Sequence, residues 1–91
     1  MRIWAKIICD QRIYNQTVRE FTSLRSFSNE EIEDMVHVLC QELDLSRPVL
    51  LQKHYREFRQ FQRLTFKAPD FMEPISFDRF EVELIKEKKR Q

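Results

Sequence analysis

The chain contains no glycine among its 91 residues. Glycine tolerates positive φ and close backbone approach, so phosphate-binding loops, dinucleotide-binding turns, nucleophile elbows and most two-residue hairpin turns depend on it. None of these can be built here in its usual form. The sequence therefore argues against the common nucleotide-binding and hydrolase sites, and no other motif defines an activity in their place.

The composition is that of a soluble globular domain. Apolar residues make up 42% of the chain, including eight Phe, and charged residues make up 34%. A chain of this length buries roughly 60–65% of the surface that its unfolded form exposes, which is enough for one core. We therefore expect a single domain over residues 1–85 and a charged, frayed tail over residues 86–91.

The sequence also predicts a cytoplasmic protein without a membrane partner. No apolar run approaches the ~20 residues that a membrane span needs. Lys6 and Asp10 interrupt any signal-peptide core in the first ten residues. In the cytoplasm, Cys9 and Cys40 are expected to be free thiols, although the sequence does not exclude that they lie close enough for a bridge.

The first part of the chain has the period-two pattern of a β-hairpin. Apolar residues occupy every second position from Ile3 to Cys9, and residues 13–21 continue with β-favouring Ile, Tyr, Thr and Val. Residues 10–12 lie between these segments. Without glycine, the connection is either a tight turn that places Asp10 or Gln11 at positive φ, or a loop of three to five residues.

A helix is predicted to begin at Ser28 and to run to about Leu43. The Ser28 hydroxyl can accept from the Glu31 amide while the Glu31 carboxylate reaches back to the Ser28 amide, and Phe27 and Ile32 fit a hydrophobic staple. The residues with helical spacing on one apolar stripe are Ile32, Met35, Val36, Leu39 and Leu43.

The second part of the chain predicts one more helix and two more strands. Helical spacing extends over residues 52–61. Period-two alternation covers residues 64–66 and residues 80–84, and Pro69 ends the first of these two strands. The order β-β-α-α-β-β indicates an α+β fold with an antiparallel or mixed sheet packed against helices. The order of the strands in the sheet does not follow from these patterns.

Four segments carry a resemblance that spans most of the chain. The opening MRIWAKII, the capped acidic helix, the stretch RPVLLQKH and the closing FDRFEVELI resemble a group of small uncharacterised bacterial proteins with a similar order of strands and helices. The resemblance implies a bacterial cytosolic setting. It brings no activity and no functional residues with it.

The candidate residues for metal binding and catalysis each have a structural explanation as well. Cys9, His37, Cys40 and His54 could form a zinc site or a thiolate–imidazole pair, but their spacing matches no zinc-finger pattern, and buried cysteines usually act as small hydrophobes. The abundant carboxylates occupy positions that favour solvation rather than acid–base work. We therefore expect no enzyme, no cofactor, no metal and no small-molecule substrate.

A basic segment is one candidate for function. The net charge is only +1, but residues 46–69 hold six bases against one acid. Basic side chains interleaved with aromatic ones are typical of single-stranded nucleic-acid binding, although the aromatic residues, which are Tyr55, Phe58, Phe61 and Phe66, also stand at core spacing. The candidate nucleic-acid-binding residues are Arg47, Lys53, Arg56, Arg59, Arg63 and Lys67.

The preferred candidate is a protein-interaction surface on the hairpin. If the helices cover the face that carries Ile3, Ala5 and Ile7, apolar residues on the opposite face are left in water. These residues are Trp4, Ile8, Tyr14 and Val18. We expect protein–protein interaction or self-association, with nucleic-acid binding as the alternative; a sheet covered by one helix on each face would remove this surface.

Overall fold

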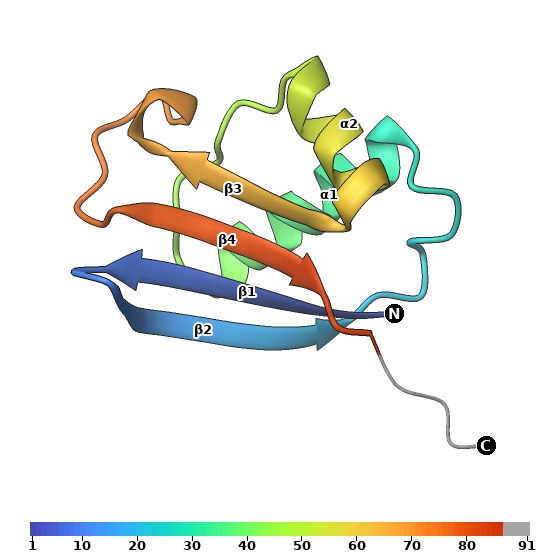
Figure 1. The fold of residues 1–91 in the computed structure, drawn as a ribbon, viewed down its shortest axis with the longest axis horizontal. Helices are drawn as coiled ribbons and strands as arrows, with labels where there is room; N and C mark the ends of the chain where they lie inside the picture. The colour runs from blue at the N-terminus through green and yellow to red at the C-terminus, as the bar shows by residue number, and fades with distance from the viewer. Residues whose placement is uncertain (87–91) are drawn as a thin grey trace.

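A computed structural model describes residues 1–86 of the chain. It contains one antiparallel four-stranded sheet with the order β2-β1-β4-β3 (Figure 1). The strands are β1 (Arg2–Cys9), β2 (Arg12–Glu20), β3 (Arg63–Lys67) and β4 (Arg79–Leu84). The helices are α1 (Asn29–Glu42) and α2 (Gln52–Phe61), and a short 3₁₀ turn, η1 (Ala68–Asp70), follows β3.

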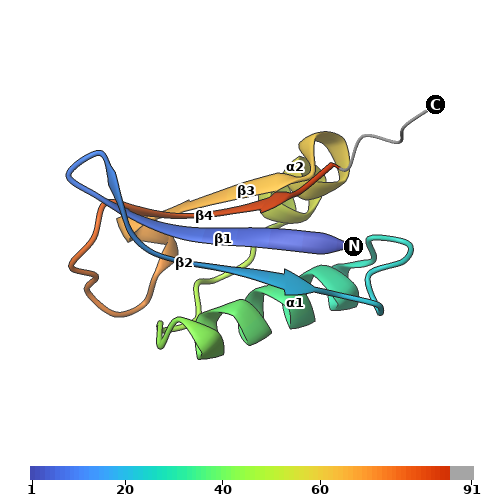
Figure 2. The same ribbon diagram turned by 90° about the horizontal axis from the view of Figure 1, so that it is seen from below.

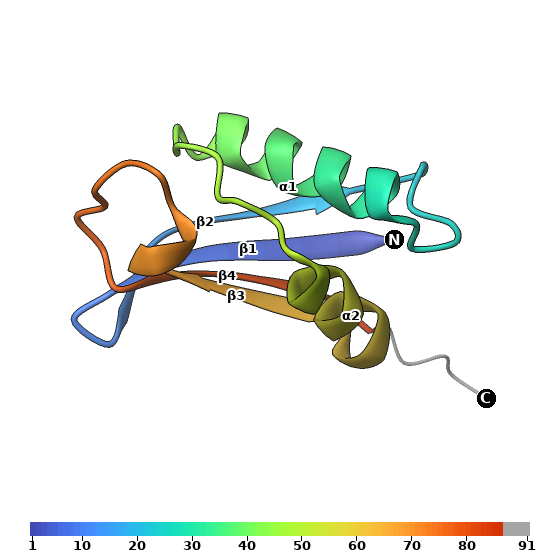
Figure 3. The ribbon, with the colours of Figure 1, turned by 90° about the horizontal axis from the view of Figure 1, so that it is seen from above.

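Both helices pack against the same face of the sheet. Figure 2 shows α1 running along one side of β1 and β2, and Figure 3 shows α2 beside β3, at the other end of the sheet. A single hydrophobic cluster joins the inward side chains of β1, β3 and β4 to the apolar faces of both helices. This arrangement confirms the predicted α+β domain, and no helix of residues 1–86 covers the opposite sheet face.

The hairpin turn is the tighter of the two alternatives. Cys9 pairs with Arg12, so only Asp10 and Gln11 connect the strands, with φ values of 52° and 64°. Two successive positive φ values match the twist of the flanking strands. The Asp78 carboxylate accepts a hydrogen bond of 2.9 Å from the Asp10 amide, which ties the turn to the residue before β4.

Three more residues take left-handed conformations where glycine is usually found. Asp44 and Gln62 follow the two helices with φ values of 56° and 55°, and Phe27 precedes α1 with a φ of 57°. A left-handed residue other than glycine costs about 1–2 kcal/mol. The strain at Phe27 is offset because the Glu31 carboxylate accepts from the amides of Arg25, Ser26 and Phe27 itself.

The start of α1 confirms the predicted cap and extends it. The Ser28 hydroxyl accepts from the Glu31 amide at 3.2 Å. The Glu31 carboxylate binds the three preceding amides instead of the expected amide of Ser28. Burial raises the pKa of Glu31, but hydrogen bonds from Ser26, Arg25 and Phe27 outweigh it and leave the pKa lower than usual.

Replacing Ser28 with alanine is expected to lower the free energy of unfolding by ~1 kcal/mol, because one amide of the first helical turn loses its acceptor. Urea denaturation followed by circular dichroism measures the change. Ser23→Ala, in the exposed loop before α1, is the control. Equal midpoints for the Ser28 variant and the wild type would contradict the capping role.

Two expectations concern membrane spans and the C-terminal tail. Neither helix of the described residues combines the length and apolarity that crossing a membrane requires. The charged tail expected over residues 86–91 lies outside the described residues, apart from Lys86.

Candidate functional site

The sheet face turned away from the helices is a charged surface with a small apolar part. Trp4 and Lys6 of β1 lie opposite Glu83 and Glu81 of β4. The Lys6 ammonium lies 2.8 Å from the Glu83 carboxylate, 3.5 Å from that of Glu81 and 4.0 Å from the centre of the Trp4 ring. The expected apolar face is therefore polar at its centre.

Trp4 is held in place by this network. Its indole N–H donates to the Gln16 side chain at 2.8 Å, while Lys6 covers its ring. Its other cross-strand partner is Val18, whose side chain is 47% exposed. Trp4 and Val18 therefore form the apolar part of this face that borders the outer edge of β2.

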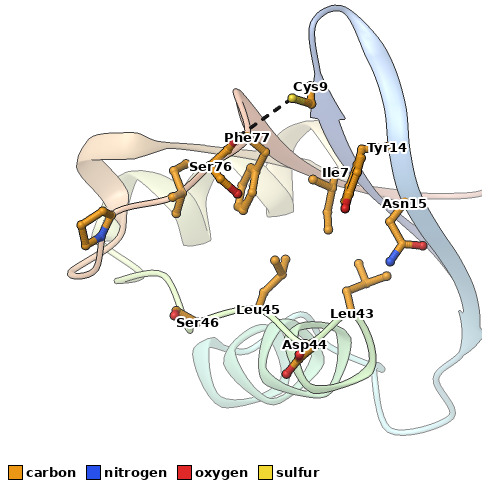
Figure 4. A pocket seen from close by; sticks show the side chains of 12 residues that line it. Ile7, Cys9, Tyr14, Asn15, Leu43, Asp44, Leu45, Ser46, Ser76 and Phe77 are labelled. Carbon is orange, nitrogen blue, oxygen red and sulfur yellow. Dashed lines mark hydrogen bonds between the residues drawn. The ribbon is translucent and has the colours of Figure 1, made fainter.

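The prediction that Tyr14 shares this face is wrong. The register shifts between Ile7 and Ile8, which pair with Asn15 and Ile13, so Tyr14 is the extra residue of a β-bulge. Tyr14 lines a hollow together with Ile7, on the helix side of the sheet (Figure 4). Ile8 is only 6% exposed. Of the four expected residues, only Trp4 and Val18 offer accessible side chains on the outer face.

The backbone of β2 forms an open edge. Met1 and Phe21 exchange two hydrogen bonds, of 2.7 and 3.0 Å, just before the first pair of the β1–β2 ladder. In an antiparallel pair, hydrogen-bonded and non-hydrogen-bonded residues alternate. Gln16, Val18 and Glu20 therefore direct their amides and carbonyls away from β1. Since β2 is the last strand of the sheet, no described strand pairs with these groups, although the Gln16 amide donates to the Asn15 side chain at 2.9 Å.

Two side chains on the helix side hold the edge against α1. The Thr17 hydroxyl and the Arg19 guanidinium donate to the Glu42 carboxylate at 2.6 and 2.7 Å. These two hydrogen bonds lower the pKa of Glu42 below its usual value. They keep the stretch 16–20 extended, while the bulge at Tyr14 lies outside it.

The structure brings together only some of the basic residues. Lys53, Arg56 and Lys67 line a shallow hollow of about 600 Å³ between α2 and β3. Arg59 points elsewhere, because it donates to the Phe27 carbonyl and to the Asn29 side chain at the start of α1. Arg47 and Arg63 do not line this hollow.

The aromatic residues of the basic segment are mostly core. Phe58 and Phe66 are fully buried and Tyr55 is 8% exposed, whereas Phe61 is 54% exposed with Arg63 near its ring. The hollow also contains the acidic residues Glu57 and Asp70. The basic segment thus offers one exposed aromatic ring, that of Phe61, and a mixed set of charges to a nucleic acid.

Both cysteines are free, as expected. Burial raises the pKa of the Cys40 thiol to about 12. Cys9 is half-buried, and its pKa is raised by burial and by the nearby Asp10 and Asp78. Within residues 1–86, no group of three or more His, Cys, Asp or Glu side chains is arranged to hold a metal ion.

Comparisons with protein-family models, with curated proteins and with solved structures find no match to this chain. Function is therefore inferred from its own geometry. The open edge of β2 could not be found from the sequence, since it depends on which strand pairs with the second side of β1. The bulge that moves Tyr14 likewise has no signal in the alternation of residues 12–20.

Proposed function

We propose that this protein is a non-enzymatic domain that self-associates by pairing the β2 edges of two copies. The observation that carries the proposal is the run of outward backbone groups at Gln16, Val18 and Glu20, which follows from the Met1–Phe21 pair and the register. Open edges of this kind pair readily with another strand. The second copy extends the sheet from four strands to eight.

The residues of β2 favour an antiparallel register centred on Val18. In this register Val18 lies opposite its own counterpart, and each Gln16 lies opposite Glu20 of the other copy. The side-chain NH₂ of Gln16, whose side-chain oxygen accepts from Trp4, donates to the Glu20 carboxylate, and the apolar row Trp4–Val18 continues across the two-fold axis. Only residues 16–20 pair, so the bulge at Tyr14 stays outside the contact.

Charges on the helix side support the same register. Arg19 of one copy lies opposite Thr17 of the other, and the Thr17 hydroxyl already contacts Glu42. Arg19 is thereby placed near a carboxylate of each copy, because it also donates to Glu42 of its own chain. The contact is complementary in charge on one face and apolar on the other.

The test is Val18→Pro, because proline removes the amide at the centre of the contact. That amide faces away from β1, where proline is tolerated in an edge strand. The two central hydrogen bonds are lost, at about 1 kcal/mol each, so dimerisation should weaken roughly thirtyfold. Sedimentation over a range of concentrations measures the association, and circular dichroism checks that the fold is kept.

Two lysine variants make the test independent of proline effects. Val18→Lys should weaken dimerisation as well, through charge repulsion at the two-fold axis. Val49→Lys is the matched control, since Val49 is 41% exposed and lies outside the sheet. A wild type that stays monomeric at all concentrations, or a dimer that both Val18 variants leave intact, would overturn the proposal.

Nucleic-acid binding by the basic segment ranks second. Lys53, Arg56 and Lys67 share one hollow, but Arg59 is bound to the start of α1 and the aromatics beside it are mostly buried. Single-strand binding needs exposed rings on which bases can stack. Phe61 alone meets this condition within the basic segment.

A further inference from the structure

A hollow of about 520 Å³ lies on the helix side of the sheet, and its lining reaches Asn15, next to the first residue of the β2 edge contact. It is enclosed by the β-hairpin, the segment that follows α1 and the loop before β4 (Figure 4). This volume falls within the range of small-molecule sites. The hollow is therefore large enough for a molecule the size of a substituted benzene ring.

The floor of the hollow is apolar. Ile7 and Leu43 are 3% and 8% exposed, and Leu45 and Phe77 are half-buried. Figure 4 shows the side chains of Ile7, Leu43, Leu45 and Phe77 converging on the open space. Apolar side chains that meet without filling the space between them offer a ligand an apolar contact surface.

The rim of the hollow is polar, and no lysine or arginine lines it. On the hairpin side, the Cys9 thiol lies 4.0 Å from the Ser76 carbonyl oxygen. Asp10 and Asp78 lie close enough to this thiol to raise its pKa. Asp44 forms the opposite rim, with its carboxylate turned away from the floor (Figure 4). Acidic residues thus flank the hollow on both sides: Asp44 lines it, Asp10 and Asp78 lie just outside its lining, and the cationic Arg12, which pairs with Cys9, is not a lining residue either.

We propose that this hollow binds a small organic cation with an apolar body, such as an arylalkyl ammonium ion. The apolar body contacts Ile7, Leu43 and Phe77. The ammonium group lies toward Ser76, whose carbonyl accepts a hydrogen bond, and is attracted by Asp10 and Asp78. The exposed ring of Tyr14 borders the hollow on the hairpin side and can face the cation.

The test is a nuclear magnetic resonance titration with phenethylammonium. We expect saturable shifts of the methyl groups of Ile7, Leu43 and Leu45, with an affinity in the millimolar range. The neutral analogue 2-phenylethanol and the anionic analogue 3-phenylpropanoate keep the ring and change only the charge. Both analogues should bind at least roughly tenfold more weakly than phenethylammonium, because three carboxylates favour the cation.

The charge requirement is tested with a triple variant, Asp10→Asn, Asp44→Asn and Asp78→Asn. Asparagine tolerates the positive φ of Asp10 and Asp44, and at Asp78 it still accepts from the Asp10 amide. Affinity for phenethylammonium should fall roughly tenfold. Glu30→Gln with Asp34→Asn removes two acids of α1 that do not line the hollow, and should leave affinity unchanged.

A third variant tests the place of binding. Leu45→Trp fills the hollow from the segment after α1 and should abolish the shifts. The proposal is overturned if phenethylammonium gives no saturable shifts, if the neutral analogue binds equally well, or if Leu45→Trp leaves binding intact. It is also overturned if the triple variant and the control lose affinity equally.

Discussion

Replacing Phe66 with alanine is expected to lower the free energy of unfolding by about 3–5 kcal/mol. Phe66 is fully buried and lies next to the last residue of β3. Its ring centre lies 4.8 Å from that of His54, 5.9 Å from that of Phe80 and 6.5 Å from that of Phe71. The alanine side chain leaves a cavity that the two helices and the sheet cannot close without moving together.

Guanidinium denaturation followed by circular dichroism measures this loss. The free energy of unfolding of a small domain is about 5–15 kcal/mol, so the variant should unfold at a much lower denaturant concentration than the wild type. Phe61→Ala is the matched control, because Phe61 is 54% exposed at the end of α2. Its effect should stay below ~1 kcal/mol. Similar losses for the two variants would contradict the way in which α2 and β3 face the core.

Local signals were sufficient to predict the elements of this fold. The cap at Ser28 and the stripe beginning at Ile32 correctly predict a helix that starts at Asn29. Helical spacing predicts the bounds of α2, Gln52–Phe61, and alternation finds the strand at Arg79–Leu84. In each case the residues that determine the structure lie within a few positions of one another, so the sequence displays the pattern directly.

The position of Tyr14 shows where alternation fails. Side chains in a strand change face at every residue, so one extra residue moves all that follow to the other side. The bulge opposite Ile7 places Tyr14 and Asn15 on the same side of the sheet, next to the hollow. Strict alternation instead assigned Tyr14 to the face of Trp4. A bulge inserted between β-favouring residues leaves no pattern that would reveal it.

The open edge and the divided basic segment depend on contacts between distant parts of the chain. β1 pairs with β4, about seventy residues away in the chain, and this pairing leaves only the other side of β1 for β2. Likewise, Arg56 lines the hollow while Arg59 contacts Phe27, because the packing of α2 against the start of α1 sets their directions. Neither outcome follows from spacing within one segment.

Replacing His54, at the start of α2, is expected to have the second large effect on stability. His54 is 1% exposed, and its Nδ1 accepts from the Leu51 amide at 2.9 Å, which caps the helix and places the proton on Nε2. Nε2 has no hydrogen-bond partner among the described residues and lies 3.6 Å from the Asp70 carboxylate. His54→Ala is expected to cost about 2–4 kcal/mol at neutral pH, from the lost cap and the lost contact with Phe66.

The same contacts predict acid sensitivity. Burial lowers the pKa of His54 below 6.5, and the attraction of Asp70 only partly opposes this. The unfolded chain therefore binds a proton at a higher pH than the folded chain does. The free energy of unfolding should then fall as the pH drops below about 6.5, by at most ~1.4 kcal/mol per pH unit, until the folded pKa is passed. Protonation at Nδ1 also displaces the Leu51 amide and weakens the cap.

His54→Gln separates titration from capping, because a glutamine at this third helical position can still accept from the Leu51 amide. Denaturation between pH 7.5 and 5, a range of about one unit or more on either side of the usual histidine pKa, should show a fall in stability for the wild type that the variant lacks. His37→Gln, on the half-exposed side of α1, is the matched control and should retain the fall. An equal fall in the wild type and in both variants would assign the acid sensitivity to carboxylates, and His54 would then be only a packing and capping residue.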